Sequence, residues 1–442
     1  MERRNSLSRR CCCLGIMTGT SLDGIDLAVL FISRKDTSTH CLHTEDNVEL
    51  EKEDDILLDM GPYEVFEMPR DTKQLLEESI TLANEIMVDT GRRRRLLSEG
   101  SLPPIPPILD VKAFREAERS LTDAVAAVVK QFVSTHSLSI DLVGFHGQTI
   151  LHEPKQRLSW QLGDGDRLSK LLGMTVVGCF RQNDIQHGGQ GAPLAPLYHQ
   201  ALFHATNSLQ LKGQTDRNQI VAILNIGGVS NLTAIDTGSG KIIAAFDCGP
   251  GNALMDEFMK ETKNVEFDVD GLLASGGTVN TIILQEFKDH AKVYDYLRKS
   301  PPKSLDKKTI SLGDVCRKYT SQQIPRVSIA DIMATLSQFT VYCCIEGARL
   351  HLPELPVRWL ITGGGRRNAD LMRRLEESFY PAVTQSVDAI GWRGDALEAE
   401  AFAFLAYKSI RNHPISMPET TGVTVAMTGG VKYDHERIEN ES

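Results

Sequence analysis

The 442-residue sequence lacks an apolar run long enough to cross a membrane, has no C-x-x-C motif and carries no excess of positive charge. A membrane-spanning helix needs about 20 apolar residues in a row, and the N-terminus has no apolar segment of the kind that directs secretion. The formal net charge is −10, whereas a nucleic-acid backbone attracts a basic surface. We therefore expect neither a membrane nor a nucleic-acid partner.

Cysteine is present, but not in a metal-binding spacing. The chain has nine cysteines, among them Cys11, Cys12 and Cys13 in succession and the neighbours Cys343 and Cys344. These groupings lack the spaced pairs that hold a zinc ion. We expect reduced thiols, several of them in the core, and hence a cytoplasmic protein.

The remaining composition is that of a globular protein, with 41% hydrophobic and 24% charged residues and a length that suits two or three domains. Apolar periodicity predicts helices over 71–89, 111–136 and 328–350, the last capped by Ser328, and a buried strand over 142–150. Each is long enough to contribute to a sizeable core.

Two stretches interrupt this pattern. Residues 40–62 are polar and rich in acidic side chains, and residues 91–107 contain four consecutive arginines from Arg92 followed by several prolines. Like-charge runs and proline-rich segments favour solvated loops. We expect both stretches to be surface insertions, the first followed by a strand at 63–68.

The most informative stretch lies near the N-terminus. Residues 12–17 and 27–32 are apolar runs of strand length, and residues 18–24 between them are mostly small or hydroxyl-bearing. Backbone N–H groups and hydroxyls in such a turn can face an anion, while Asp23 and Asp26 would require a bridging cation. From this turn alone, a metal-bound phosphate and an ordinary hairpin are both open readings.

The same unit recurs in the second half. Residues 220–235 again read as strand, glycine-rich turn and strand, and further glycine-rich turns at 247–252 and 363–365 also follow apolar strands. The repetition favours a duplicated fold with a cleft between its halves. Phosphoryl transfer depends on positioning and charge neutralisation, so several such turns around one cleft are typical of a nucleotide kinase.

Ten motifs then make the chain resemble the anhydro-N-acetylmuramic acid kinases, members of the acetate kinase, sugar kinase, heat-shock protein 70 and actin superfamily. The motifs occupy residues 15–26, 144–150, 160–164, 180–185, 188–194, 225–232, 247–252, 301–304, 362–368 and 394–403. The resemblance implies an α/β, two-lobed actin-like ATPase, that is, a duplicated ribonuclease H-like fold with a central nucleotide cleft. It places one lobe at 11–206 and the other at 207–442, with the last segment able to return to the first lobe.

The resemblance also implies a reaction. Water attacks the anomeric carbon of a 1,6-anhydro sugar, the bridge opens, and the released O6 accepts the γ-phosphoryl group of ATP. Asp184 matches the family's base, although it could instead cap the neighbouring glycine-rich turn. Sugar contacts are expected from His146, Gln148, Thr149, Arg181 and Glu398. His146 could equally be a satisfied residue at a strand end, and Glu398 a solvent-facing helix residue.

ATP and Mg²⁺ are the implied cofactors, and the residues expected to bind the nucleotide come from the glycine-rich turns. The metal would be held by Asp23, directly or through a water molecule. The expected ATP and phosphate contacts are Gly19, Thr20, Ser21, Leu22, Asp23, Gly24, Ile25, Asp26, Gly227, Gly228, Asp247, Gly249, Gly251, Asn252, Gly363, Gly364, Gly365 and Asn368.

Three departures from the family pattern leave alternatives open. Cys179 replaces an aspartate before Phe-Arg, Gln186 replaces an alanine, and residues 305–308, which include Lys307 and Lys308, replace Thr-Gly-Arg-Glu. The leading expectation is a kinase that opens and phosphorylates 1,6-anhydro-N-acetylmuramic acid. Its alternatives are a levoglucosan (1,6-anhydroglucose) kinase and a nucleotide-binding regulatory protein with weakened catalysis. The expected partners are ATP and a small anhydro sugar, and a homodimer is an oligomeric state that the sequence leaves open.

Overall fold

The structure is a computed structural model that describes residues 10–19, 22, 24–34, 56–92, 112–207, 219–305, 309–315 and 327–435. The chain divides into two compact units. Unit 1 comprises residues up to 205 together with 398–417 and 423 onward, and unit 2 comprises 206–397 together with 418–422. No helix among the described residues is both long and apolar enough to cross a bilayer.

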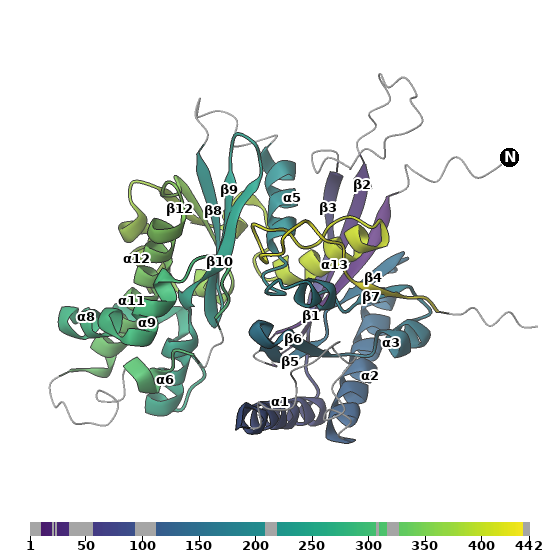
Figure 1. The fold of residues 1–442 in the computed structure, drawn as a ribbon, viewed down its shortest axis with the longest axis horizontal. Helices are drawn as coiled ribbons and strands as arrows, with labels where there is room; N and C mark the ends of the chain where they lie inside the picture. The colour runs from purple at the N-terminus through teal and green to yellow at the C-terminus, as the bar shows by residue number, and fades with distance from the viewer. Residues whose placement is uncertain are drawn as a thin grey trace, which may run out of the picture. The chain divides into compact units, whose positions relative to one another are not determined.

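Unit 1 is built on a six-stranded sheet with the order β13-β7-β4-β1-β2-β3 (Figure 1). Neighbours β1, β2 and β3 pair antiparallel, whereas β4 runs parallel to β1 and β7 parallel to β4. The unit contains β1 (Cys11–Thr18), β2 (Gly24–Arg34), β3 (Ile56–Glu67), α1 (Arg70–Arg92), α2 (Lys112–Thr135), β4 (Leu142–Phe145), β5 (Gln148–Glu153), η3 (Pro154–Gln156), β6 (Leu158–Leu162), α3 (Gly165–Leu172), β7 (Val176–Gly178), α4 (Gln182–Gln186), α5 (Pro196–Asn207), α13 (Leu397–Ile410) and β13 (Val431–Tyr433).

Side-chain alternation along β1 explains how the unit 1 sheet is covered. Leu14 and Ile16 point to one face, where they share a core with Leu121 and Val125 of α2. Gly15 points to the other face, where an added methyl group would overlap the backbone of α13. Helix α13 can therefore lie directly against β1, and this close approach requires glycine.

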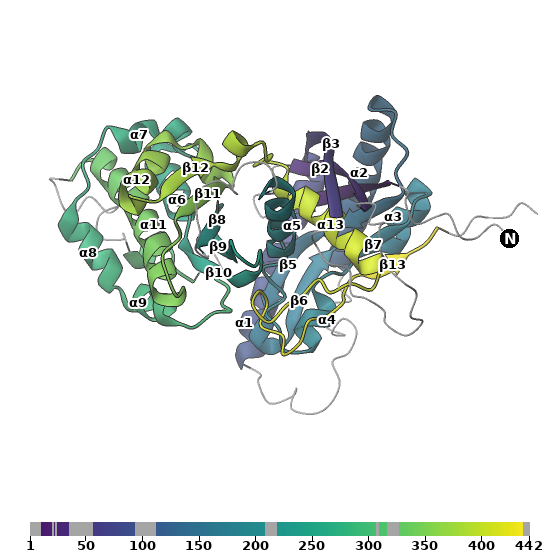
Figure 2. The same ribbon diagram turned by 90° about the horizontal axis from the view of Figure 1, so that it is seen from above.

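Unit 2 is built on a five-stranded sheet with the order β10-β9-β8-β11-β12. Helices α6, α11 and α12 share the core on one face of this sheet (Figures 1 and 2). The unit contains β8 (Ile220–Ile226), β9 (Val229–Asp236), β10 (Ile242–Pro250), α6 (Ala253–Lys263), η4 (Val269–Gly271), α7 (Leu272–Ser275), α8 (Thr281–Asp289), α9 (Ala291–Arg298), α11 (Ile329–His351), β11 (Arg358–Thr362), η5 (Gly364–Arg367), α12 (Ala369–Phe379), β12 (Val383–Ser386) and η6 (Val387–Ile390).

The two sheets repeat one topology, which confirms the predicted duplication. Strands β8, β9 and β10 pair antiparallel as β1, β2 and β3 do, and β11 and β12 continue the sheet in parallel as β4 and β7 do. The predicted hairpins at 12–32 and 220–235 are confirmed as β1–β2 and β8–β9. Ser328 is the N-cap of α11, its hydroxyl accepting from the Asp331 N–H at 3.0 Å.

Two local expectations were wrong. The single strand expected over 142–150 is split into β4 and β5, which belong to different sheets, because Gly147 takes a left-handed backbone conformation between them. Strand β3 begins at Ile56, inside the stretch expected to be an insertion. Exposure alternates from Ile56 to Met60, as in a strand with one covered face, and Asp59 is on the exposed side. Strand β3 lies at the edge of the sheet.

Candidate active site

Asp184 lies on the short helix α4, just after β7, and is only 1% exposed. Its Oδ1 accepts a hydrogen bond from the Gly191 backbone N–H at 2.5 Å. Its Oδ2 is buried, and no hydrogen-bond partner for it exists among the described residues. One oxygen therefore holds the loop, as the capping alternative expects, while the other has no partner among the described residues.

Glycine is required beside this carboxylate. A methyl group on Gly189 would overlap the Asp184 carboxylate, and the Gly189 N–H donates to the Asp184 carbonyl at 2.9 Å. Gly191 has a φ of 67°, which favours glycine. The glycine-rich motif thus wraps closely around Asp184.

Arg181 lies at the N-terminus of α4 and is held by two acceptors. Its Nε donates to Nε2 of His146 at 3.0 Å, and its Nη1 donates to the Gly191 carbonyl at 2.6 Å. Burial lowers the pKa of Arg181 to about 10, and the charges of Glu398 and Asp184 oppose that shift. The guanidinium therefore lies within electrostatic reach of both carboxylates.

His146 is buried and makes hydrogen bonds through both ring nitrogens. Besides accepting from Arg181, it contacts the Gly147 carbonyl through Nδ1 at 2.7 Å. Its pKa is well below the usual value, first because of burial and then because of the Arg181 charge. The ring is therefore neutral, in agreement with its role as an acceptor from a guanidinium.

The other expected sugar-binding residues also belong to unit 1. Gln148, at the start of β5, is fully buried, and its Oε1 has no hydrogen-bond partner in the described part of the chain. The Thr149 hydroxyl accepts from Gln161 at 3.3 Å. Glu398 is exposed in the first turn of α13, as the solvent-facing alternative expects.

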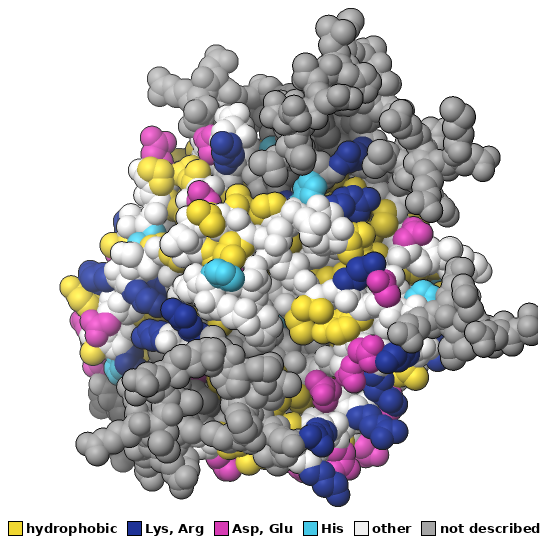
Figure 3. All heavy atoms as spheres, turned by 45° about the vertical axis from the view of Figure 1, so that its right-hand side comes forward, with side chains coloured by type: hydrophobic (Ala, Val, Ile, Leu, Met, Phe, Trp, Pro, Cys, Tyr) yellow, Lys and Arg dark blue, Asp and Glu magenta, His cyan; other side chains and the backbone are white. Residues whose placement is uncertain are grey.

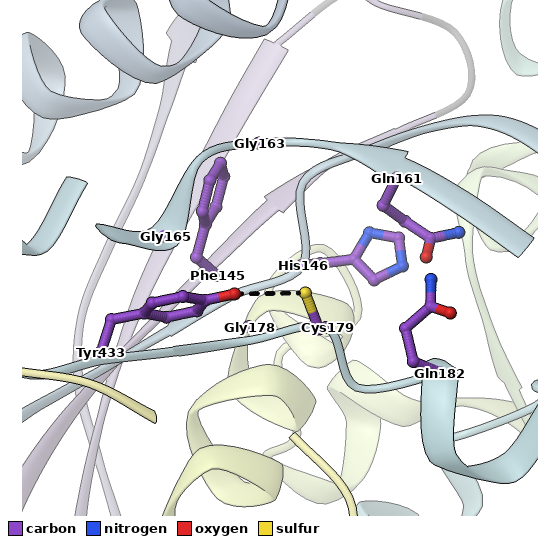
Figure 4. A pocket seen from close by; sticks show the side chains of 9 residues that line it. All are labelled: Phe145, His146, Gln161, Gly163, Gly165, Gly178, Cys179, Gln182 and Tyr433. Atoms are coloured by element: carbon purple, nitrogen blue, oxygen red, sulfur yellow. Dashed lines mark hydrogen bonds between the residues drawn. The ribbon is translucent and has the colours of Figure 1, made fainter. Parts of the chain in front are cut away.

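Cys179, the first departure from the family pattern, lines a small cavity (Figure 4). It has a φ of 54°, and its Sγ lies 3.4 Å from the Tyr433 hydroxyl of β13. The cavity, of about 20 Å³, has room for about one water molecule and not for a sugar. Its lining consists of Phe145, His146, Gln161, Gly163, Gly165, Gly178, Cys179, Gln182 and Tyr433.

The glycine-rich turns of unit 2 lie against one another. The Asn252 N–H donates to the Gly227 carbonyl at 2.7 Å, and the Gly251 N–H donates to the Gly228 carbonyl at 2.9 Å. A methyl group on Gly363 would overlap the side chain of Asn225 and the backbone next to it. The structure therefore brings together three turns that are far apart in the sequence.

Two residues of these turns already have structural partners. Asp247 accepts from the Leu305 N–H at 2.7 Å, and burial raises its pKa to about 7. Asn368 is the N-cap of α12, and its Oδ1 accepts from the Leu371 N–H at 2.9 Å. Gly249, also among the expected contacts, packs its backbone against Cys343 of α11.

An ionic cluster beside the turn at residues 363–365 was not predicted from the sequence. Arg366 donates to the Gly363 carbonyl at 3.0 Å, to Asp388 at 2.7 Å and to Asp395 at 2.9 Å. An arginine directly after three glycines was the available signal, but its partners come from a distant segment. Through its hydrogen bond to the Gly363 carbonyl, Arg366 connects the turn to the two aspartates.

The N-terminal turn is described only in part. Thr20, Ser21 and Asp23 lie outside the described residues, as do Lys307, Lys308 and most of the arginine run. The Leu22 N–H donates to the Gly19 carbonyl at 3.2 Å, and Gly24 and Ile25 begin β2. The Asp26 Oδ1 accepts from the Tyr63 hydroxyl at 3.1 Å.

Comparison with known proteins assigns the chain to a family. The family model described as anhydro-N-acetylmuramic acid kinase matches residues 104–435. Proteins of that name from Rhodospirillum rubrum and Rhodopseudomonas palustris strain BisB18 are 38% and 36% identical over 420 residues each. The alignments cover 95% of this chain and 93% of the first relative, and 94% of this chain and 98% of the second.

Two solved structures also resemble the chain weakly. Component A of (R)-2-hydroxyglutaryl-CoA dehydratase from Acidaminococcus fermentans is 10% identical with a TM-score of 0.43, over 90% of this chain and 98% of that one. A ROK family glucokinase from Streptomyces griseus is 13% identical with a TM-score of 0.35, and the match covers 90% of this chain and 99% of the glucokinase chain. Both TM-scores are below 0.5, so these likenesses add nothing to the assignment. On its sequence relatives, the chain belongs to the anhydro-N-acetylmuramic acid kinase family.

Proposed function

We propose that this protein uses ATP to open 1,6-anhydro-N-acetylmuramic acid by hydrolysis and to phosphorylate its O6, giving N-acetylmuramic acid 6-phosphate. As a member of this family it is a kinase, a phosphotransferase that acts on a sugar hydroxyl. Curated relatives of that name align over nearly the whole chain, and none of those reported above is named a levoglucosan kinase or a regulator. The structural observation that carries the proposal is the buried Oδ2 of Asp184, for which the described part of the chain offers no hydrogen-bond partner.

Asp184 is proposed as the general base. Its Oδ2 takes a proton from the attacking water, the water oxygen bonds to the anomeric carbon, and the bond from that carbon to O6 breaks. The released O6 then accepts the γ-phosphoryl group of ATP. A base needs a free lone pair within hydrogen-bond reach of the proton, and the bond from the Gly191 N–H to Oδ1 leaves Oδ2 available for this purpose.

The sugar contacts are proposed around this carboxylate. Arg181 carries a positive charge close to Asp184 and Glu398, so it can hold sugar oxygens and the developing negative charge on O6. Gln148 offers a buried carbonyl oxygen to a sugar hydroxyl, and Thr149 adds a hydroxyl next to it. A sugar with many hydroxyls requires such a set of donors and acceptors.

The nucleotide is proposed to use the glycine-rich turns. In unit 2, Asn252 is the N-cap of α6 and makes no side-chain cap bond among the described residues. The Ala253 N–H already donates to the Gly228 carbonyl at 3.3 Å, so the N–H groups of Leu254 and Met255 are the ones proposed to face phosphate oxygens. Gly227, Gly228 and Gly251 present backbone without side chains at the same place, and residues 363–365 are proposed to lie near the adenosine. Asp247 and Asn368 are proposed to shape these turns.

In unit 1, the turn at residues 19–26 is proposed to hold the β- and γ-phosphates. Mg²⁺ would neutralise phosphate charge there, with Asp23 as the proposed metal-binding carboxylate. On the face drawn in Figure 3, acidic and basic side chains lie next to one another at several places, which is the ordinary surface pattern of a globular protein. The cysteines of the described residues are free thiols, which suits the cytoplasmic location that we propose.

The test is a product assay. Purified protein is incubated with ATP, Mg²⁺ and either anhydro sugar, and the 6-phosphate is followed by mass spectrometry. We expect product from 1,6-anhydro-N-acetylmuramic acid and none after chelation of Mg²⁺. Product from 1,6-anhydroglucose alone would favour the levoglucosan alternative, and ATP binding without product from either sugar would favour the regulatory one.

Asp184→Asn tests the base. We expect it to abolish product while ATP still binds, because an amide cannot accept the proton. Asp59→Asn is the matched control, since Asp59 forms an exposed ion pair with Arg10 in the same unit and such pairs contribute little. Turnover of the Asp184→Asn variant at the wild-type rate would remove Asp184 as the base.

A further inference from the structure

The geometry of unit 1 points to a different role for His146: we infer that it is a positioning residue, which holds Arg181 in place through a neutral ring protonated on Nδ1, and that it is not a ligand of the sugar. This inference rests on the proposed function, because Arg181 and Asp184 belong to the site proposed above.

The ring nitrogens of His146 are both committed within the protein. An arginine cannot accept a hydrogen bond, so the 3.0 Å contact between Arg181 Nε and His146 Nε2 requires a lone pair on Nε2. The proton of the neutral ring is then on Nδ1, where it can be donated to the Gly147 carbonyl at 2.7 Å. No ring nitrogen is left over for a sugar hydroxyl.

The surroundings hold the ring in this orientation. Phe402 of α13 packs against it with the ring centroids 4.5 Å apart. The carbonyl that accepts from Nδ1 also accepts from the Thr18 hydroxyl at 3.3 Å, and Thr18 is itself buried at the end of β1. His146 is therefore anchored from β1 and α13 as well as from its own loop.

Arg181 in turn connects to the carboxylates through Gly191. The Gly191 carbonyl accepts from Arg181 Nη1, and the Gly191 N–H donates to Asp184 Oδ1. Two acceptors, His146 Nε2 and the Gly191 carbonyl, thus define the plane of the guanidinium and leave its other N–H groups for oxygen atoms near Asp184 and Glu398. We call this arrangement the Arg181 clamp.

Loss of His146 would open the Arg181 clamp on one side. Leucine at this position leaves the partly buried Nε–H of Arg181 without an acceptor, so the guanidinium can rotate away from its catalytic orientation. Glutamine differs, because its carbonyl can accept from Arg181 while its amide donates to the Gly147 carbonyl. The pair His146→Leu and His146→Gln therefore separates the hydrogen-bonding role from simple packing.

The first experiment compares kcat and KM of both variants. A misplacement of about 1 Å at a reacting group can reduce the rate by ~10²-fold, so we expect a fall of that order in kcat for His146→Leu, with KM for ATP unchanged. We expect His146→Gln to recover most of the loss. His136→Leu is the matched control, since His136 pairs with Glu64 elsewhere in unit 1. Equal losses in the leucine and glutamine variants would overturn the inference.

A double-mutant cycle with Arg181→Lys tests the direction of action. Lysine lacks the Nε–H that the Arg181 clamp uses, so if His146 acts through Arg181, His146→Leu causes little further loss of kcat in that background. A histidine that touched the sugar directly would instead give losses that multiply. Thermal unfolding of each variant shows whether a loss of kcat reflects a loss of folded protein.

A spectroscopic measurement keeps this inference separate from the proposed function. Histidine labelled with ¹⁵N in the full-length protein reports which ring nitrogen carries the proton, and the signals missing from His146→Leu identify the residue. We expect the Nδ1–H form at pH 7, whether or not either anhydro sugar is a substrate. An Nε2–H or a doubly protonated ring would overturn the inference even for an active kinase, whereas an inactive protein with the Nδ1–H form would overturn only the proposed function.

Discussion

Gly189→Ala is the sharpest probe of how the Asp184 carboxylate is held. The backbone of Gly189 is outside the left-handed region, so alanine adds no conformational strain. Its methyl group would lie 2.7 Å from Asp184 Oδ2 and closer still to Oδ1. Restoring an ordinary contact of about 3.5 Å moves Oδ2 by about 0.8 Å, and Oδ1 must move further. The carboxylate is then displaced from its 2.5 Å hydrogen bond with the Gly191 N–H.

The expected cost follows from that displacement. A shift approaching 1 Å can lower the rate by ~10²-fold, which corresponds to about 2.7 kcal/mol of activation free energy. The assay measures kcat with saturating ATP and sugar, together with the Kd for ATP, which we expect to be unchanged. Gly276→Ala is the control, because Gly276 has an ordinary backbone conformation and an added methyl group there meets no atom closer than 3.6 Å. A folded Gly189→Ala protein with a kcat within about twofold of wild type would refute this account of the site.

Two further predictions concern residues of the unit 2 turns. The folded-state pKa of Asp247 is about 7, whereas its ordinary value is 3.8. Its contribution to stability is therefore present below pH 4 and is lost as the pH rises towards 7. From pH 5 to pH 7, urea unfolding should show the free energy of unfolding of Asp247→Asn rising by at most about 3 kcal/mol relative to that of wild type, and an equal difference at both pH values would contradict this. Asn368→Ala should lower the free energy of unfolding by about 1 kcal/mol, because the α12 cap is lost, whereas Asn368→Ser should keep the cap. A raised Kd for ATP in the serine variant would show that Asn368 also contacts the nucleotide.

The duplicated fold could be predicted because its signals are local and repeated. A strand, a glycine-rich turn and a second strand occur at 12–32 and again at 220–235, and strand pairing across a short turn needs no information from elsewhere in the chain. The N-terminus of α11 could be predicted for the same reason, because Ser328 caps an N–H only three residues further along the chain. Family motifs then indicated which of these turns belong to a kinase.

The split of residues 142–150 into strands β4 and β5 could not be predicted from the local sequence. Apolar residues continue on both sides of His146 and Gly147, so periodicity suggests one strand. The structure breaks it because β4 pairs with β1 and β7 while β5 pairs with β6. The start of strand β3 was likewise placed too late, since Asp59, Gly61 and Pro62 resemble a loop unless the neighbouring strand is known.

Sequence by itself determined the fold class, the family and the residue types available for the reaction, including the conspicuous Asp184 loop. Tertiary structure decided what those side chains do. His146 meets Arg181, 35 residues further along the chain, and Asp247 meets Leu305, 58 residues away. A buried polar group takes its charge state and its role from the partner that the fold brings to it, because an unpaired one is costly, and that partner cannot be read from neighbouring residues.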